Sequence, residues 1–97
     1  MAKGYWILHV TVTDPGRYPD YVALDTPIVT AHGGRFLVRG GQNEAPETPQ
    51  RDRHVIVEFP SYQAAVDCYR GAGYQEAATI RRAASDCDIV IVEGTAP

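Results

Sequence analysis

The first secondary-structure transition of the chain is encoded by YWILHVTV at residues 5–12 and by the TDP that follows at residues 13–15. Aromatic and β-branched residues fill the first segment, which is typical of a strand. Asp14 and Pro15 match the N-cap and the first position of a helix. A strand that passes so directly into a helix predicts the first two elements of a βαβ unit.

The same reading extends to the rest of the chain. Gly33-Gly34 ends the first helix, residues 42–51 form an exposed hairpin loop with two prolines, and Pro60-Ser61 ends a strand and caps a helix. The predicted elements are strand 4–12, helix 15–32, strands 35–41 and 52–60, helices 61–70 and 74–84, and strand 87–94. This order predicts an α+β, ferredoxin-like βαββαβ fold, with a four-stranded antiparallel sheet and helices on one face.

Composition limits the classes of function. The chain has 97 residues, of which 44% are hydrophobic and 22% charged, so we expect one folded domain over residues 1–97. A net charge of −3 gives no electrostatic reason to bind nucleic acid or an anionic membrane. We see no signal peptide and no apolar run near ~18 residues, so a cytoplasmic location is expected. Cys68 and Cys87 fit neither a disulfide framework nor a zinc motif.

Alternation along the strands assigns two faces to the sheet. The face predicted to lie under the helices carries Trp6, Leu8, Val10, Val12, Val55, Val57, Phe59, Val90 and Val92. The opposite face carries Tyr5, Ile7, Leu37, Ile56, Ile89 and Ile91. Left in water, these six side chains would form a patch larger than monomers usually expose. The sequence therefore predicts a homodimer that packs sheet against sheet.

Polar candidates for catalysis are expected on that second face. His9, Arg39, His54 and Glu58 can share it, and a His, a carboxylate and an Arg would suffice for acid–base chemistry on a small anion. Alternatively, these groups pair with each other at a wet dimer interface. His54 and Glu58 lie about 13 Å apart along one strand, so no metal site is expected. Asp14 is a further catalytic candidate, although its first interpretation is a helix cap.

Candidate ligand-binding residues lie elsewhere. If a ligand site exists, we expect it between the first helix and the sheet, near Tyr18, Tyr21, Arg39 and Tyr74, because buried tyrosine hydroxyls need polar partners. Arg81 and Arg82 stand at the end of a helix, where one of them could reach an anion, and Arg82 is taken as the candidate.

Two motifs carry a family resemblance. GGRFLVRGG at residues 33–41 and EFPS at residues 58–61 resemble an uncharacterised bacterial domain-of-unknown-function family of the dimeric α/β-barrel superfamily. This superfamily also includes antibiotic-biosynthesis monooxygenases and muconolactone isomerase. The resemblance implies an antiparallel sheet that packs against its twin to form a barrel, and it implies no particular activity.

Two functions of different classes remain open. The first is a homodimeric binding domain for a small aromatic or carboxylated metabolite, with no catalysis. The second is a cofactor-free enzyme, similar to a monooxygenase or an isomerase. The chain has no nucleophile elbow and no phosphate-binding glycine loop, and we expect no cofactor.

Overall fold

A computed structural model describes residues 1–97 of the chain. Its elements are, in order, β1 (Gly4–Val12), α1 (Tyr18–Ala31), β2 (Arg35–Arg39), β3 (Arg53–Phe59), α2 (Tyr62–Arg70), α3 (Ala72–Ala84) and β4 (Ser85–Glu93). The predicted βαββαβ order is confirmed, with the second helix divided at Gly71 into α2 and α3.

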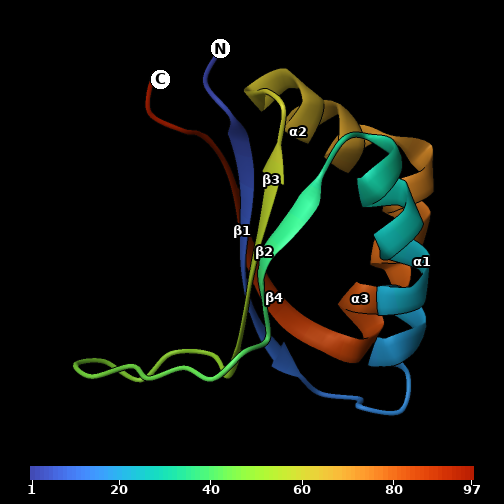
Figure 1. The fold of residues 1–97 in the computed structure, drawn as a ribbon. Coiled ribbons are helices and arrows are strands. Elements are labelled where there is room, and N and C mark those ends of the chain that lie inside the picture. The colour runs from blue at the N-terminus through green and yellow to red at the C-terminus, as the bar shows by residue number, and fades with distance from the viewer.

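The four strands form one antiparallel sheet in the order β2-β3-β1-β4. All three helices lie against one face of this sheet (Figure 1). We call the other face the open face. Residues 40–52, which connect β2 and β3, form an exposed arm that projects away from the helices on the side of the open face (Figure 1). None of the helices has the length and the apolar character needed to cross a bilayer.

Trp6 is at the centre of the core between the helices and the sheet. Its side chain is 1% exposed and packs against the rings of Phe59 and Tyr74, at centroid distances of 5.0 and 4.7 Å. Its Nε1 donates a hydrogen bond to the carbonyl oxygen of Ala65, at 2.9 Å. Because that carbonyl belongs to α2, the indole fixes this helix against β1.

The first helix begins later than predicted. The carboxylate of Asp14 accepts hydrogen bonds from the backbone N–H groups of Gly16 and Arg17, at 3.1 and 3.3 Å. These bonds close a turn, and the regular helix starts only at Tyr18. Asp14 therefore caps the turn that leads into α1, which agrees with its capping interpretation but shifts the boundary by three residues.

The side chains of β4 have the opposite orientation to the one predicted. Ile89 and Ile91 pack against the core, whereas Val90 and Val92 lie on the open face and are 52% and 41% exposed. Residues 89–92 are all apolar, so an alternation of polar and apolar residues could not indicate which of them face the helices. The register decides it, because Ile91 pairs with Trp6 of the neighbouring strand β1, whose side chain lies under the helices.

A β-bulge moves Arg39 away from the open face. Phe36 pairs with Val57 and Val38 pairs with Ile56, so Leu37 is an extra residue in β2. Beyond the bulge the alternation is shifted by one, and Arg39 pairs with the core residue Val55. The prediction that Arg39 shares a face with His9, His54 and Glu58 is therefore wrong.

Gly4 is a position where the packing requires glycine. A Cβ atom at Gly4 would lie 2.3 Å from the backbone oxygen of Ser61, which the turn into α2 holds in place. We expect Gly4→Ala to destabilise the protein by about 2 kcal/mol, because β1 or this turn must move. Urea denaturation measures the loss, with Gly41→Ala as the control, since nothing lies within 4 Å of a Cβ there. Equal stability of the two variants would contradict the prediction.

Candidate functional site

A small cavity lies between α1 and the sheet, and we call it the α1 cavity. Its volume is about 10 Å³, roughly the space of one water molecule. Aromatic and aliphatic side chains form most of its wall, including Trp6 and Phe36. Its polar members are Asp25 from α1, Arg39 from β2 and Arg53 from β3. The chain thus brings charged groups from three separate elements to one apolar cavity.

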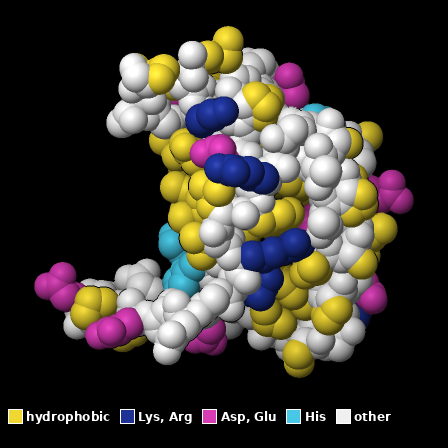
Figure 2. Space-filling view, viewed as in Figure 1, with side chains coloured by type: hydrophobic (Ala, Val, Ile, Leu, Met, Phe, Trp, Pro, Cys, Tyr) yellow, Lys and Arg dark blue, Asp and Glu magenta, His cyan; other side chains and the backbone are white.

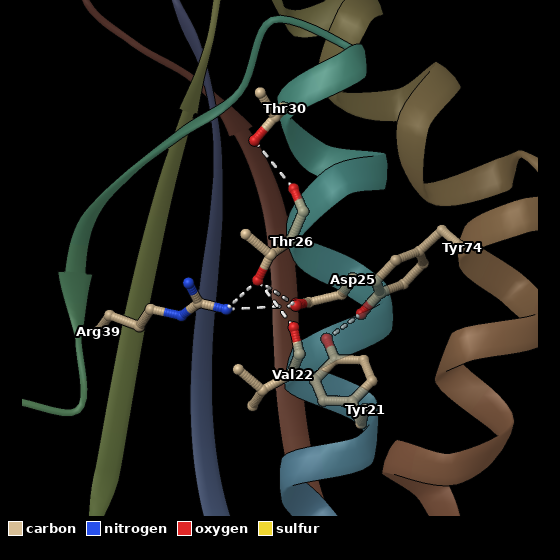
Figure 3. Close-up of polar contacts among 7 residues, drawn as sticks. All are labelled: Tyr21, Val22, Asp25, Thr26, Thr30, Arg39 and Tyr74. Carbon is tan, nitrogen blue, oxygen red and sulfur yellow. Dashed lines mark hydrogen bonds and ion pairs between the residues drawn. The ribbon is translucent and has the colours of Figure 1, made fainter.

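Asp25 is the buried acid of this cavity, at 5% exposure. Arg39 Nη2 lies 3.3 Å from its Oδ1 and donates a hydrogen bond to Thr26 Oγ1 at 2.7 Å (Figure 3). Burial raises the pKa of Asp25 to about 6, although the Arg39 charge and hydrogen bonds from Tyr21 and Thr26 lower it. A carboxyl group with this pKa exchanges a proton near neutral pH, as a general base must.

Behind the cavity, two tyrosine hydroxyls meet. Tyr21 lines the cavity, and its hydroxyl lies 2.7 Å from that of Tyr74, as Figure 3 shows. Arg81 Nη1 donates a further hydrogen bond to the Tyr74 hydroxyl, at 2.8 Å. Burial raises the pKa of both phenols, that of Tyr74 to about 12. Both hydroxyls therefore keep their protons at neutral pH and act as hydrogen-bond donors and acceptors.

The two arginines of the cavity differ in their partners. The Arg39 guanidinium is ion-paired with Asp25 and stacks over the Phe36 ring, 3.7 Å from its centroid. The Arg53 guanidinium lies 5.4 Å from the centroid of the Tyr18 ring and takes part in none of the ion pairs of the chain. Its Nε is buried and has no hydrogen-bond partner. The cavity thus holds two guanidinium groups and one carboxylate.

The predicted ligand-binding residues are only partly brought together. Tyr18, Tyr21 and Arg39 line the α1 cavity. Tyr74 is fully buried behind the cavity, where it contacts two of the lining residues, Tyr21 through its hydroxyl and Trp6 through its ring. Arg82 is exposed on α3, donates to Gln75 Oε1 at 2.9 Å and lies outside the cavity.

The remaining catalytic candidates lie on the open face in two separate groups. The Nδ1 atoms of His9 and His54 are 2.8 Å apart, as the predicted strand order allows. Glu58 instead accepts hydrogen bonds from Tyr5 Oη at 3.1 Å and from Arg35 Nε at 3.3 Å.

Figure 2 shows hydrophobic side chains along the open side of the sheet, with histidine side chains where the arm leaves it. The arm and His54 border a hollow of about 460 Å³. No group of three or more His, Cys, Asp or Glu side chains comes together as metal ligands would.

Sequence reasoning missed Asp25 and Arg53. The signal for Asp25 was available, because it lies four residues after Tyr21 and four before Val29, on the buried face of α1. Arg53 had a signal too, because it lies two residues before the buried Val55 and four before the buried Val57, and residues two apart on a strand share a face.

The chain was compared with known proteins and structures. No curated protein matches the chain. A protein of unknown function from Rhodopseudomonas palustris is similar at 24% identity, with 99% of this chain and 85% of that chain covered and a TM-score of 0.78. SnoaB, a cofactor-independent oxygenase from Streptomyces nogalater, is similar at 14% identity, with 100% and 97% covered and a TM-score of 0.68.

A dimeric ferredoxin-like protein of unknown function from Thermobifida fusca is similar at 12% identity, with 95% of this chain and 91% of that chain covered and a TM-score of 0.54. At these identities the likeness establishes a common ferredoxin-like fold and not a common activity.

A family model gives the more direct relationship. The model of the family described as Domain of unknown function (DUF1330) matches residues 3–95. This range includes every strand and helix of the structure, and therefore every residue of the α1 cavity. It also includes both motifs on which the family resemblance rests. The chain therefore belongs to the DUF1330 family.

Proposed function

We propose that this protein is a homodimeric binding domain for a small aromatic carboxylate, which each subunit takes into its α1 cavity. The observation that carries the proposal is the charge of the cavity. Arg39 and Arg53 bring two positive charges, while Asp25 brings one negative charge that is only partly ionised near pH 6. An anion with a flat apolar body matches both the excess positive charge and the aromatic wall.

Entry of such a ligand requires the cavity to widen, since it now has room for about one water molecule. The surrounding elements favour this opening. β2 is a five-residue edge strand interrupted by a bulge, and α1 packs mainly against α3 rather than against β2. A movement between α1 and β2 therefore leaves the central strands in place. In the widened site, Arg53 is the first carboxylate ligand, because it has no ion pair to break.

The proposal of a dimer rests on the apolar side chains of the open face. Ile7 and Ile56 lie on it, together with Val38, Val90 and Val92, which are 38% to 52% exposed. A sheet with helices on one face alone leaves such a surface in water unless a second sheet covers it. The neighbour from Thermobifida fusca is dimeric, which supports a homodimer of this chain. We propose that residues 1–97 act as one domain and that two copies pack open face to open face into a barrel.

The binding proposal is tested with benzoate as the probe. Isothermal titration is expected to give saturable binding of benzoate and at least tenfold weaker binding of benzyl alcohol, which keeps the ring and lacks the charge. Arg53→Met should weaken benzoate binding by roughly tenfold or more, because a hydrogen bond to a charged group contributes about 1.5–3 kcal/mol.

Arg70→Met is the matched control, since Arg70 is exposed at the end of α2. Equal binding of benzoate and benzyl alcohol would contradict the proposal, as would an equal loss of affinity in the two arginine variants.

A second candidate function is a cofactor-free oxygenase or isomerase. Asp25 favours it, because a carboxyl group with a pKa near 6 beside an aromatic cavity can accept a proton from a phenol or an activated C–H bond. The shared fold with SnoaB adds an analogy. His9, His54 and Glu58 would serve such chemistry only at the interface of two sheets, outside the α1 cavity. Oxygen uptake and mass spectrometry of phenols incubated with the protein and with Asp25→Asn separate this function from simple binding.

A further inference from the structure

Another pocket lies where α3 ends and β4 begins, and Arg51 of the arm also borders it. We call it the β4 pocket. It has a volume of about 300 Å³ and is lined by Arg51, Arg81, Arg82, Ser85, Asp86 and Cys87. Three of these six residues carry a guanidinium group, and Asp86 alone carries a carboxylate. The α1 cavity has none of these six residues in its wall.

Arg81 is the unusual member of the β4 pocket. The residue is 5% exposed, and it takes part in none of the three ion pairs of the chain. Its Nη1 donates to the neutral hydroxyl of Tyr74 at 2.8 Å, while its Nε is buried and has no hydrogen-bond partner. A charge taken out of water is costly unless an opposite charge or a full set of hydrogen bonds compensates it. This guanidinium therefore combines a buried positive charge with an unused donor.

The other two arginines are held in position by their own partners. Arg51 binds Asp88 through Nε at 2.9 Å and Thr11 through Nη1 at 3.1 Å. Arg82 binds Gln75 Oε1 through Nη2 at 2.9 Å. Each of these contacts leaves further N–H groups of a guanidinium, which has five. Arg51 from the arm and Arg81 and Arg82 from α3 thus bring three guanidinium groups to the wall of one pocket.

We propose that the β4 pocket binds a phosphate group, with Arg81 as the buried anchor and with Arg51 and Arg82 as the outer ligands. A planar carboxylate is satisfied by a single guanidinium fork, whereas a phosphate offers several oxygens in tetrahedral directions and suits three separate forks. The negative charges of Asp86, in the pocket wall, and of Asp88, which pairs with Arg51, oppose binding but are outnumbered by three positive charges. This site is independent of the proposed binding of an aromatic carboxylate in the α1 cavity.

The test follows the side-chain Nε–H signal of Arg81 by NMR during titration at constant ionic strength. Sodium phosphate is one probe, phenyl phosphate is the second, and sodium chloride is the control. We expect a saturable shift of the Arg81 signal with phosphate and none with chloride. Stronger binding of phenyl phosphate would identify the phosphate of an organic metabolite as the ligand, and equal or weaker binding would identify free phosphate.

Variants separate this site from general charge effects. The double variant Arg51→Gln/Arg82→Gln should weaken phosphate binding at least tenfold while the fold is kept, because Arg82 is exposed and Arg51 is only half-buried. Arg70→Gln, which removes an exposed arginine from α2, should leave the affinity unchanged. Non-saturable shifts, equal shifts with chloride, or unchanged affinity in the double variant would each overturn the proposal.

Discussion

Val90→Asp is expected to convert the proposed homodimer into a monomer. Val90 is 52% exposed on the open face and pairs with Ile7 at the centre of the sheet. Each large apolar side chain that the partner buries contributes about 1.5–3 kcal/mol. The substitution removes one such contribution from each subunit and places an unpaired carboxylate in the interface, which costs several kcal/mol more. Together these effects should raise the dissociation constant more than a thousandfold.

Sedimentation equilibrium at low micromolar concentration measures this change directly. Leu24→Asp is the matched control, because Leu24 is 47% exposed but lies on α1, away from the open face. We expect the control to keep twice the mass of the chain and Val90→Asp to show the mass of one chain. A monomeric wild-type protein would refute the sheet-against-sheet dimer, and so would two variants that behave alike.

The order of the elements could be predicted because local signals carry it. Asp14 and Ser61 each mark the turn into a helix with their own side-chain hydrogen bonds, and Gly33 has a φ of +79° at the end of α1. Such signals depend on a few neighbouring residues and not on the rest of the fold. The ferredoxin-like order of these elements then predicted that β1 and β3 are neighbours, so that His9 could approach His54 or Glu58, and the structure pairs His9 with His54.

The faces of the two edge strands could not be predicted from the same signals. In β4 every residue from Ile89 to Val92 is apolar, so only pairing with β1 decides which side chains reach the core. In β2 the sequence gives no sign of the bulge at Leu37, and one inserted residue moves Arg39 to the other face. In both strands, the face of each side chain is decided by its pairing with the neighbouring strand, which the sequence of the strand itself does not reveal.

The candidate site depends on the same long-range information. Tyr18 and Tyr21 were predicted from the periodicity of α1 alone, whereas Arg39 joins them only because of the bulge. Asp25 had a local signal, since a single carboxylate interrupts the buried face of α1. In the ion pair between Asp25 and Arg39, the helix periodicity is enough to place Asp25 on the buried face of α1. The side of the sheet on which Arg39 lies is known only from the folded structure.

Asp25→Asn is expected to abolish a large part of the pH dependence of stability. The pKa of Asp25 is about 6 in the folded protein and 3.8 at its ordinary value, which the unfolded chain adopts. Well below pH 3.8 the group is protonated in both states. Between pH 4 and 6 the unfolded chain loses the proton first, so the free energy of unfolding falls as the pH rises. The difference in pKa corresponds to a loss of about 3 kcal/mol by pH 7.5.

Urea denaturation at pH 4.5 and pH 7.5, at one fixed protein concentration, isolates this contribution. The uncharged amide of Asn cannot ionise, so the stability of Asp25→Asn relative to wild type should rise by about 2 kcal/mol between the two pH values. Other titrating groups are the same in both proteins and cancel in this difference. If the difference between Asp25→Asn and wild type is the same at both pH values, Asp25 is ionised as easily in the folded protein as in the unfolded chain, and its role as a base near neutral pH falls with that result.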